Sequence, residues 1–194
     1  MHAADAILAM AQVPGNRAFA EAWLGWRGDR LVPRRADLDL ASIRKMLPMV
    51  LMIEVISPTE APIRVAGTRL REFTGYELTG INYIELAPPQ RRDIRGHRTW
   101  ESACQPCGTH LIYHHRYRSG LVAKAEVLSL PIEPTEGGGK RLMLSHIAPM
   151  AFLDRAMDEA ASMAVEIGDP FAYVDVGAGV PASDLPDTSL CRVA

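Results

Sequence analysis

Five apolar, β-branched segments constrain the fold of this chain more than any other feature. Two lie early, at Met49–Ile56 between prolines and at Ile63–Gly67 after a short turn. Three longer segments follow, at Thr109–Arg118, Leu121–Ile132 and Lys140–Ile147. Runs of this kind, bounded by Pro, Gly and Ser, are typical of strands. To bury their faces, all five are expected to share one antiparallel sheet, with helices packed on one side.

Short helical segments separate the two groups of strands. Thr68 can cap a helix that ends at Gly75, and a turn-like piece then runs to two prolines at 88–89. Residues 89–105 indicate a longer helix, whose first turn tolerates proline. Gly96 lies in the middle of this helix and is expected to weaken it by about 1 kcal/mol relative to Ala.

The flanking segments are expected to be helical as well. Residues 1–15 form a flexible lead-in, mobile or helical, and residues 16–48 form N-terminal flanking helices, the first capped by Asn16 and the second at 37–47. At the other end, residues 150–194 are expected to form a C-terminal helix and tail, packed on or extending from the core. The helix covers Phe152–Gly168, and residues 171–181 form a short strand or an extended arm.

Composition narrows the class of protein. The chain has 194 residues and a formal net charge of -2, which gives no electrostatic case for nucleic acid binding. No run reaches the roughly 18 apolar residues that a membrane span needs, and the N-terminus lacks the features of a signal peptide. Three cysteines make a disulfide framework unexpected. We therefore expect a cytoplasmic protein without a membrane or nucleic acid partner.

Two strands, a cluster of short helices and three long strands is the order found in a PAS domain. Residues 23–55 and 64–80, with the turn Ala66-Gly67-Thr68, resemble a bacterial PAS domain family typical of alphaproteobacteria. The resemblance extends over residues 23–181. It implies an α+β fold with a five-stranded antiparallel sheet, short helices on one face, a PAS core at residues 49–149, and flanking segments at both ends.

The resemblance also implies a function. A PAS-like unit that occupies nearly the whole chain leaves no output domain, so we expect a stand-alone sensory or adaptor module that binds a small ligand, a signalling protein or both. The ligand is unidentified and no cofactor is indicated. The sequence carries no hydrolase, P-loop, metalloprotease, kinase or cyclase motif, and the chain is therefore expected not to be an enzyme.

A ligand pocket in such a fold lies between the sheet and the short helices. Alternation along the third strand places Leu111, Tyr113 and His115 on a face suited to a core or cavity wall, and His110 and His114 on the opposite, polar face. Aromatic and imidazole side chains supply the pocket candidates, each of which could instead only fill the core: Phe73, Tyr76, Tyr83, Trp100, Tyr113 and His115.

The N-terminal helix carries a stripe formed by Phe19, Trp23 and Trp26 at helical spacing. In PAS proteins such a helix often packs on the outer face of the sheet and takes part in dimerisation, which implies a homodimer here. The alternative is an intramolecular cap without any dimer.

Two functions of other classes stay open. A metal or redox site could use His97, Cys104, Cys107 and His110, because two thiolates and two imidazoles can hold tetrahedral zinc. The chain lacks a second CxxC, so two ordinary cysteines at a helix–strand joint are the competing interpretation.

The second of these functions is an interaction module with a filled core and no ligand.

Overall fold

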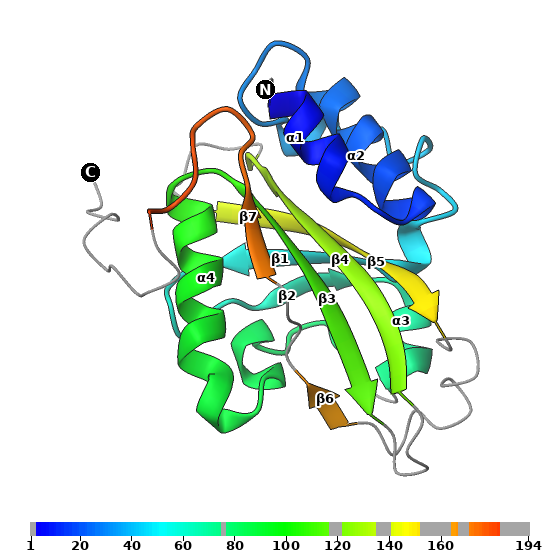
Figure 1. Cartoon of the computed structure of the whole chain (residues 1–194), viewed down its shortest axis with the longest axis vertical. Coiled ribbons are helices and arrows are strands. Elements are labelled where there is room, and N and C mark those ends of the chain that lie inside the picture. The colour runs from blue at the N-terminus through cyan, green and yellow to red at the C-terminus, as the bar shows by residue number, and fades with distance from the viewer. Residues whose placement is uncertain are drawn as a thin grey trace.

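The computed structural model describes residues 3–74, 77–116, 122–134, 141–151, 164–166 and 171–182. An antiparallel sheet forms the centre, and helices lie on both of its faces (Figure 1). The α-helices are α1 (Ala3–Met10), α2 (Pro14–Arg27), α3 (Thr68–Thr74) and α4 (Arg92–Cys104). Four short 3₁₀ helices are η1 (Arg35–Asp37), η2 (Leu47–Met49), η3 (Tyr83–Leu86) and η4 (Pro89–Arg91).

The five expected strands are present in the expected order. They are β1 (Val50–Val55), β2 (Ile63–Ala66), β3 (Gly108–Arg116), β4 (Val122–Ile132) and β5 (Arg141–Ala151). They pair antiparallel in the order β2-β1-β5-β4-β3. The first and second groups of strands therefore meet where β1 pairs with β5.

Two further strands extend the sheet beyond the five. Strand β7 (Phe171–Val174) pairs with the first half of β3, and β6 (Ala164–Glu166) pairs with its last three residues. Without them β3 would be an edge strand with a row of unpaired backbone groups. The C-terminal segment thus covers the edge of the sheet.

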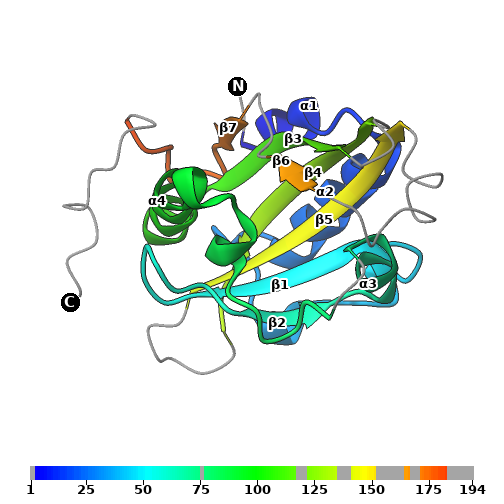
Figure 2. The ribbon, with the colours of Figure 1, turned by 90° about the horizontal axis from the view of Figure 1, so that it is seen from below.

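Each face of the sheet has its own hydrophobic cluster. The outer cluster joins α1 and α2 to outward-facing residues such as Leu128, Leu130 and Leu144. The inner cluster joins α3, η2 and η3 to inward-facing residues such as Leu51, Ile53 and Met143. Seen from below, α3 and α4 lie at opposite ends of the sheet (Figure 2). The alternation of side chains along each strand produces both clusters from the same strands.

The N-terminal segment is more ordered than a flexible lead-in. Residues 3–10 form helix α1, and Ile7 is fully buried against the outer cluster. Of the two alternatives for residues 1–15, mobile or helical, residues 3–10 are helical, because burial of Ile7 stabilises a helix too short to persist alone.

Two local expectations are wrong. Residues 37–47 do not form the expected helix: residues 40–46 form turns between η1, which ends at Asp37, and η2, which begins at Leu47. Gly96 does not simply weaken α4, since a Cβ there would lie 1.9 Å from the carbonyl oxygen of Pro58. Gly96 therefore permits close packing of α4 on the turn between β1 and β2.

The expected helix Phe152–Gly168 lies largely outside the described residues. Its described part, residues 164–166, is strand β6, so the helix does not run to Gly168. Pairing with β3 overrides the local helix propensity there. Residues 171–174 form one of the two alternatives expected for them, a short strand. In the part of the chain that the structure describes, no helix has the length and hydropathy to cross a membrane.

Candidate functional site

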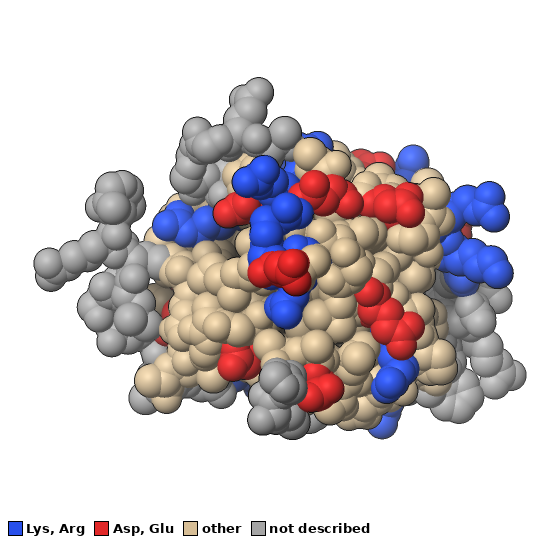
Figure 3. All heavy atoms as spheres, turned by 90° about the horizontal axis from the view of Figure 1, so that it is seen from above, with Lys and Arg blue, Asp and Glu red and all other residues tan. Residues whose placement is uncertain are grey.

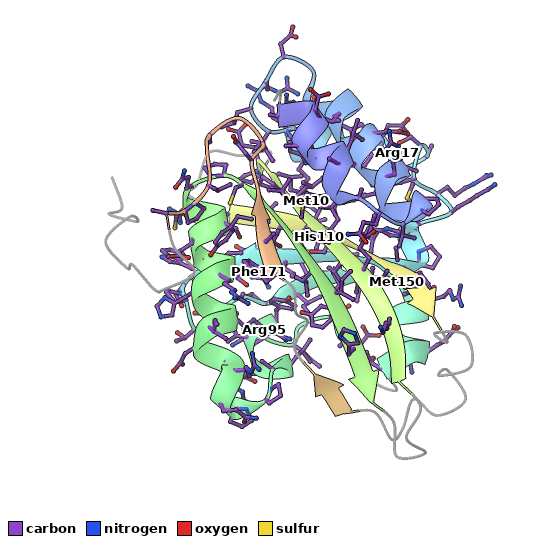
Figure 4. The ribbon with its side chains drawn as sticks, in the orientation of Figure 1. Met10, Arg17, Arg95, His110, Met150 and Phe171 are labelled. Atoms are coloured by element: carbon purple, nitrogen blue, oxygen red, sulfur yellow. The ribbon has the colours of Figure 1, made fainter. Side chains whose placement is uncertain are left out.

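A cavity of about 40 Å³ lies between α4 and the inner face of the sheet. Its wall combines apolar side chains with a larger set of polar ones. The apolar residues are Ile53, Ile94, Leu111, Met143 and Phe171, and the polar ones are Tyr83, Arg95, Arg98, Thr99, Ser102, Thr109, Tyr113 and Ser129. Figure 4 shows Arg95 and Phe171 in the region between α4 and β3.

Helix α4 supplies the charged part of the wall. Ile94, Arg98 and Ser102 recur every four residues, and Arg95 lies beside them, so one stripe of the helix faces the sheet. Arg95 is only 7% exposed. Its Nη1 donates to the carbonyl oxygen of Tyr83 at 3.2 Å, and its Nη2 donates to the hydroxyl of Tyr113 at 3.3 Å. A permanently charged group is thus held inside the fold by neutral oxygen atoms and aromatic rings.

Two tyrosines complete this cluster. The hydroxyl oxygens of Tyr83 and Tyr113 are 2.9 Å apart, and the Arg95 guanidinium lies 4.8 Å and 5.8 Å from the two ring centres. Burial raises the pKa of the Tyr113 hydroxyl above its usual value, although the charge of Arg95 opposes this. The hydroxyl of Tyr113 therefore stays protonated and can donate a hydrogen bond.

Strand β7 closes one side of the cavity. The Arg98 guanidinium lies 4.0 Å from the centre of the Phe171 ring, which contacts Tyr173 edge-to-face. The Tyr173 hydroxyl donates to Oε2 of Glu101 on α4 at 2.6 Å. These contacts attach the C-terminal strand to the same helix that carries the arginines.

The sequence identified part of this wall. Tyr83 and Tyr113 line the cavity, and Leu111 does so from the same face of β3. Trp100 does not line it, and its ring lies 4.9 Å from the Arg141 guanidinium instead. The remaining candidates, Tyr76 and the side chains of Phe73 and His115, lie outside the described residues.

The sequence reasoning missed Arg95 and Arg98. Arginines on a surface helix are usually solvated, and their long side chains hide which face they occupy. The available signal was their position on the stripe of α4 that carries Ile94, which a helical projection from Pro89 would have revealed.

On the opposite face of the sheet, the aromatic stripe of α2 is used within the chain. Phe19 and Trp23 are fully buried against the outer cluster, and the Trp23 Nε1 donates to the carbonyl oxygen of Pro131 at 2.9 Å. Trp26 is half-buried. The stripe therefore forms an intramolecular cap, and Phe19 and Trp23 are not available for direct contact with a second subunit.

A buried polar network lies beneath that cap. Glu126 on β4 is fully buried, and its carboxylate accepts bonds at 2.9 Å from the backbone nitrogens of Gln12 and Val13 and from Nδ2 of Asn16. The Nε2 of His110 also lies 2.9 Å from this carboxylate. Asn16 therefore does not cap α2, which begins at Pro14, but binds the sheet instead.

The protonation of the network follows from its partners. Burial alone would raise the pKa of Glu126, yet the hydrogen bonds that it accepts, above all from His110, lower it overall. His146 lies with Nδ1 at 2.7 Å from Oδ1 of Asn16. Burial lowers the pKa of His146 to about 4, against a weaker opposing effect of Glu126. The folded state thus favours an ionised Glu126 and a neutral His146.

The four residues of the alternative metal site are not brought together. Among the described residues no group of three or more His, Cys, Asp or Glu side chains is placed to hold a metal ion. His110 binds Glu126 on the outer face, and Cys104, against the expectation for the cysteines, is disulfide-bonded. Burial, followed by the charges of Asp175 and Glu101, raises the pKa of Cys107 to about 12, so its thiol is protonated and a poor ligand.

The surface near the N-terminal helices carries charges of both signs. Figure 3 views the molecule from above and shows Lys or Arg side chains interspersed with Asp or Glu across this face. One pair is Arg17 with Glu21 on α2, at 3.5 Å. This face does not present the single-sign field that attracts nucleic acid.

The sheet order β2-β1-β5-β4-β3, with helices over a small cavity on its inner face, defines an α+β domain of the PAS class. Residues 11–145 match the family model described as "PAS domain", which is more than half of the chain. The chain therefore belongs to the PAS domain family. Members of this family are sensory and interaction modules, typically without catalytic activity, and that general class applies to this chain.

Comparison with solved structures finds a likeness to the PAS domain of an HTR-like protein from Haloarcula marismortui. The sequences are 14% identical, the alignment covers 59% of this chain and 96% of that chain, and the TM-score is 0.33. The comparison with curated proteins finds no match.

Proposed function

We propose that this PAS domain is a sensory module that binds a small molecule in the cavity between α4 and the sheet. The observation that carries the proposal is the lining of the cavity. Arg95, Tyr83 and Tyr113 are joined by hydrogen bonds in this wall, which also contains five apolar side chains. A few fixed polar groups in an apolar wall are typical of small-molecule sites.

The strands provide a route from this cavity to the N-terminal layer. On β3, Leu111 and Tyr113 face the cavity, while His110 faces Glu126 on the outer side. A ligand that shifts β3 therefore changes the fit of the network that holds α1 and α2. The ligand acts by favouring one of two arrangements of this layer, for which it must have different affinities.

The output is a protein contact made by the N-terminal layer, in a homodimer or with a signalling partner. Since Phe19 and Trp23 face the sheet, a partner meets the outer surface of α1 and α2, where Trp26 is half-buried. Size-exclusion chromatography with light scattering tests the dimer. A Trp26→Ala variant that stays folded and keeps both its mass and its partner binding counts against this surface.

The ligand site is tested with a variant that fills the cavity. Ile94→Phe adds volume at the wall and keeps it apolar, whereas Val65→Phe places the same ring at an exposed position, 45% accessible, on β2. Native mass spectrometry of the purified protein, followed by thermal-shift screening of small metabolites, is then applied to both variants and the parent.

We expect a retained mass or a stabilising compound for the parent and for Val65→Phe, and its loss in Ile94→Phe. A compound that stabilises Ile94→Phe equally binds elsewhere and contradicts the proposed site. If no small molecule stabilises any of the three proteins, the domain acts as an interaction module without a ligand.

A further inference from the structure

We infer that the α4 cavity selects a small neutral diol, recognised by a row of hydroxyl groups that crosses the inner face of the sheet. The row consists of Thr109 on β3, Ser129 on β4 and Ser145 on β5, and the first two of these line the cavity. This inference rests on the ligand site proposed above and adds the chemical class of its ligand.

The register of the strands builds the row. Thr109 pairs directly with Ser129, and Ser129 pairs directly with Ser145. Directly opposite residues point to the same face of a sheet, with Cβ atoms about 4.5–5.5 Å apart. This face is the inner one, because Ser145 also pairs with Leu51 of the inner cluster. Three neighbouring strands therefore place three small hydroxyls side by side.

The charged part of the cavity wall is engaged within the protein. Arg95 donates to the Tyr83 carbonyl oxygen and to the Tyr113 hydroxyl, and the Arg98 guanidinium lies over the Phe171 ring. Both arginines and Tyr113 also have further interactions within the chain. The groups that recognise a ligand are therefore to be sought elsewhere in the same wall.

Thr109 has hydrogen-bonding capacity to spare. Its residue is only 7% exposed, it lines the cavity, and its hydroxyl has no hydrogen-bond partner among the residues that the structure describes. A hydroxyl that is removed from bulk water without a partner costs free energy. A ligand that bonds to this hydroxyl recovers that cost.

Ser129 can adapt its role to a ligand. Its hydroxyl oxygen lies 2.7 Å from that of Ser145, and either of the two can be the donor. When Ser145 donates, the hydrogen of Ser129 is left for a ligand, and when Ser129 donates, its oxygen can still accept a bond. Thr109 and Ser129 together therefore offer a ligand both donors and acceptors.

These properties favour a neutral molecule with two hydroxyl groups. A hydroxyl pair does not compensate a charge for the water that it loses on entering a cavity. Each hydroxyl of a diol can donate or accept, as the hydroxyls of Thr109 and Ser129 can, and two neighbouring hydroxyls in the wall match two in the ligand.

The size of the cavity limits the rest of the ligand. A volume of about 40 Å³ corresponds to roughly three water positions at about 10–15 Å³ each, which suits a molecule of about four non-hydrogen atoms. Ile94 and Leu111 add apolar surface to the same wall. Ethane-1,2-diol fits both the volume and this mixture of surfaces.

The experiment compares ethane-1,2-diol with propan-1-ol, in which a methyl group replaces one hydroxyl. Each is titrated into ¹⁵N-labelled protein, and the amide signals of α4, β3 and β4 are followed. We expect saturable shifts at these elements and about fivefold tighter binding of the diol, the ratio that one additional neutral hydrogen bond gives. A cavity that recognised only apolar surface would prefer propan-1-ol.

Thr109→Val tests the row directly, because it replaces the hydroxyl by a methyl group of similar size. It is expected to remove the preference for the diol and to leave the binding of propan-1-ol unchanged. Ser129→Ala is expected to weaken the preference as well. Thr79→Val, at an exposed position that does not line the cavity, is the matched control and keeps the preference.

Urea denaturation of Thr109→Val gives a readout that needs no ligand. Because this hydroxyl has no partner among the described residues, the free energy of unfolding is expected to stay the same or to rise. A clear loss of stability in Thr109→Val would show that the hydroxyl is already used within the protein, and would overturn the inference.

The remaining outcomes separate this inference from the proposed function. Equal or tighter binding of propan-1-ol at the cavity overturns diol selection and leaves small-molecule binding intact. An unchanged preference in Thr109→Val overturns the role of the row. If neither compound perturbs α4, β3 or β4, diol recognition is wrong, whereas the proposed ligand site itself is decided by the comparison of Ile94→Phe with Val65→Phe.

Discussion

The Nε2 of His110 lies 2.9 Å from Oε1 of Glu126, and both side chains are buried between the sheet and the N-terminal helices. The two residues are diagonal neighbours on β3 and β4, since His110 pairs directly with Leu128. Glu126 also binds the backbone just before α2. One carboxylate thus joins two central strands to the N-terminal layer, which makes that layer part of the domain.

Replacing this carboxylate by an amide is expected to destabilise the protein. Glu126→Gln keeps the shape but removes the charge and one of the two acceptor oxygens, so some of its four donors lose their partner. We expect the free energy of unfolding to fall by about 2–4 kcal/mol, measured by urea denaturation. Glu133→Gln is the matched control, because the exposed Glu133–Arg34 pair at 3.8 Å contributes about 1 kcal/mol at most.

The stability of the fold is expected to decrease in acid through two groups. The pKa of His146 is lowered from its ordinary value of 6.5 to about 4 in the folded state, so between these values the unfolded chain binds more protons and unfolding is favoured as pH falls. Glu126 has a folded pKa below its ordinary value of 4.5, so its contribution is present above that value and is lost as pH falls through the folded pKa.

Denaturation curves at pH 7.5, 6.5, 5.5 and 4.5 measure the dependence on pH. His146→Gln is expected to flatten the decline between about pH 6.5 and 4, because it removes the group that titrates there. His114→Gln, at the partly exposed end of β3, is the matched control and keeps the decline. Equal stability of the parent protein at pH 7.5 and 5.5 would show that His146 is not buried in neutral form.

Two glycines on helices are expected to respond oppositely to alanine. A Cβ at Gly25 meets nothing within 4 Å, so Gly25→Ala is expected to stabilise α2 by about 0.5–1 kcal/mol. A Cβ at Gly96 would meet the Pro58 backbone at 1.9 Å, so Gly96→Ala is expected to destabilise the protein by about 1–3 kcal/mol. Thermal and urea unfolding of both variants test the pair, and stabilisation by Gly96→Ala contradicts the close packing of α4.

The two tryptophans of α2 are expected to differ in their effect on stability. Trp23→Ala removes a fully buried side chain and its bond to Pro131, with an expected loss of about 3–5 kcal/mol. Trp26→Ala removes a half-buried side chain, and the free energy of unfolding is expected to fall by less than about half as much as in Trp23→Ala. Urea denaturation of the single variants decides this, and equal losses would indicate that Trp26 carries as much of the cap as Trp23.

The residues that line the cavity show how much of the site could be predicted from the sequence. Alternation along β3 correctly placed Tyr113 and Leu111 toward the helices, because a strand directs successive side chains to opposite faces. Arg95 escaped prediction because its position on the Ile94 stripe of α4 does not by itself distinguish a buried arginine from a solvated one. Its burial depends on Tyr83 and Tyr113, which lie 12 and 18 residues away along the chain.

The hydrogen-bond network around Glu126 on the outer face could not be predicted from the sequence for the same reason, because its members lie even farther apart along the chain. Asn16 is separated from Glu126 by 110 residues and from His146 by 130. Its sequence context indicated a helix cap, which is the usual local role of Asn. The sheet instead offers it a buried carboxylate, and that interaction determines where α2 lies.

The sequence by itself determined the order of the five central strands along the chain, the position of α4 and the membership of the PAS class. The strands and α4 follow from apolar periodicity and from the Pro and Gly residues that bound each segment, which are local properties of the chain. The PAS class follows instead from the resemblance of residues 23–55 and 64–80 to that family. The tertiary structure alone decided that residues 164–166 pair with β3, that Trp23 faces the sheet, and that Arg95 faces a cavity. Those outcomes depend on which distant groups pair with a strand edge, cover a hydrophobic stripe or bind a buried charge. Such groups come into contact only when the chain folds.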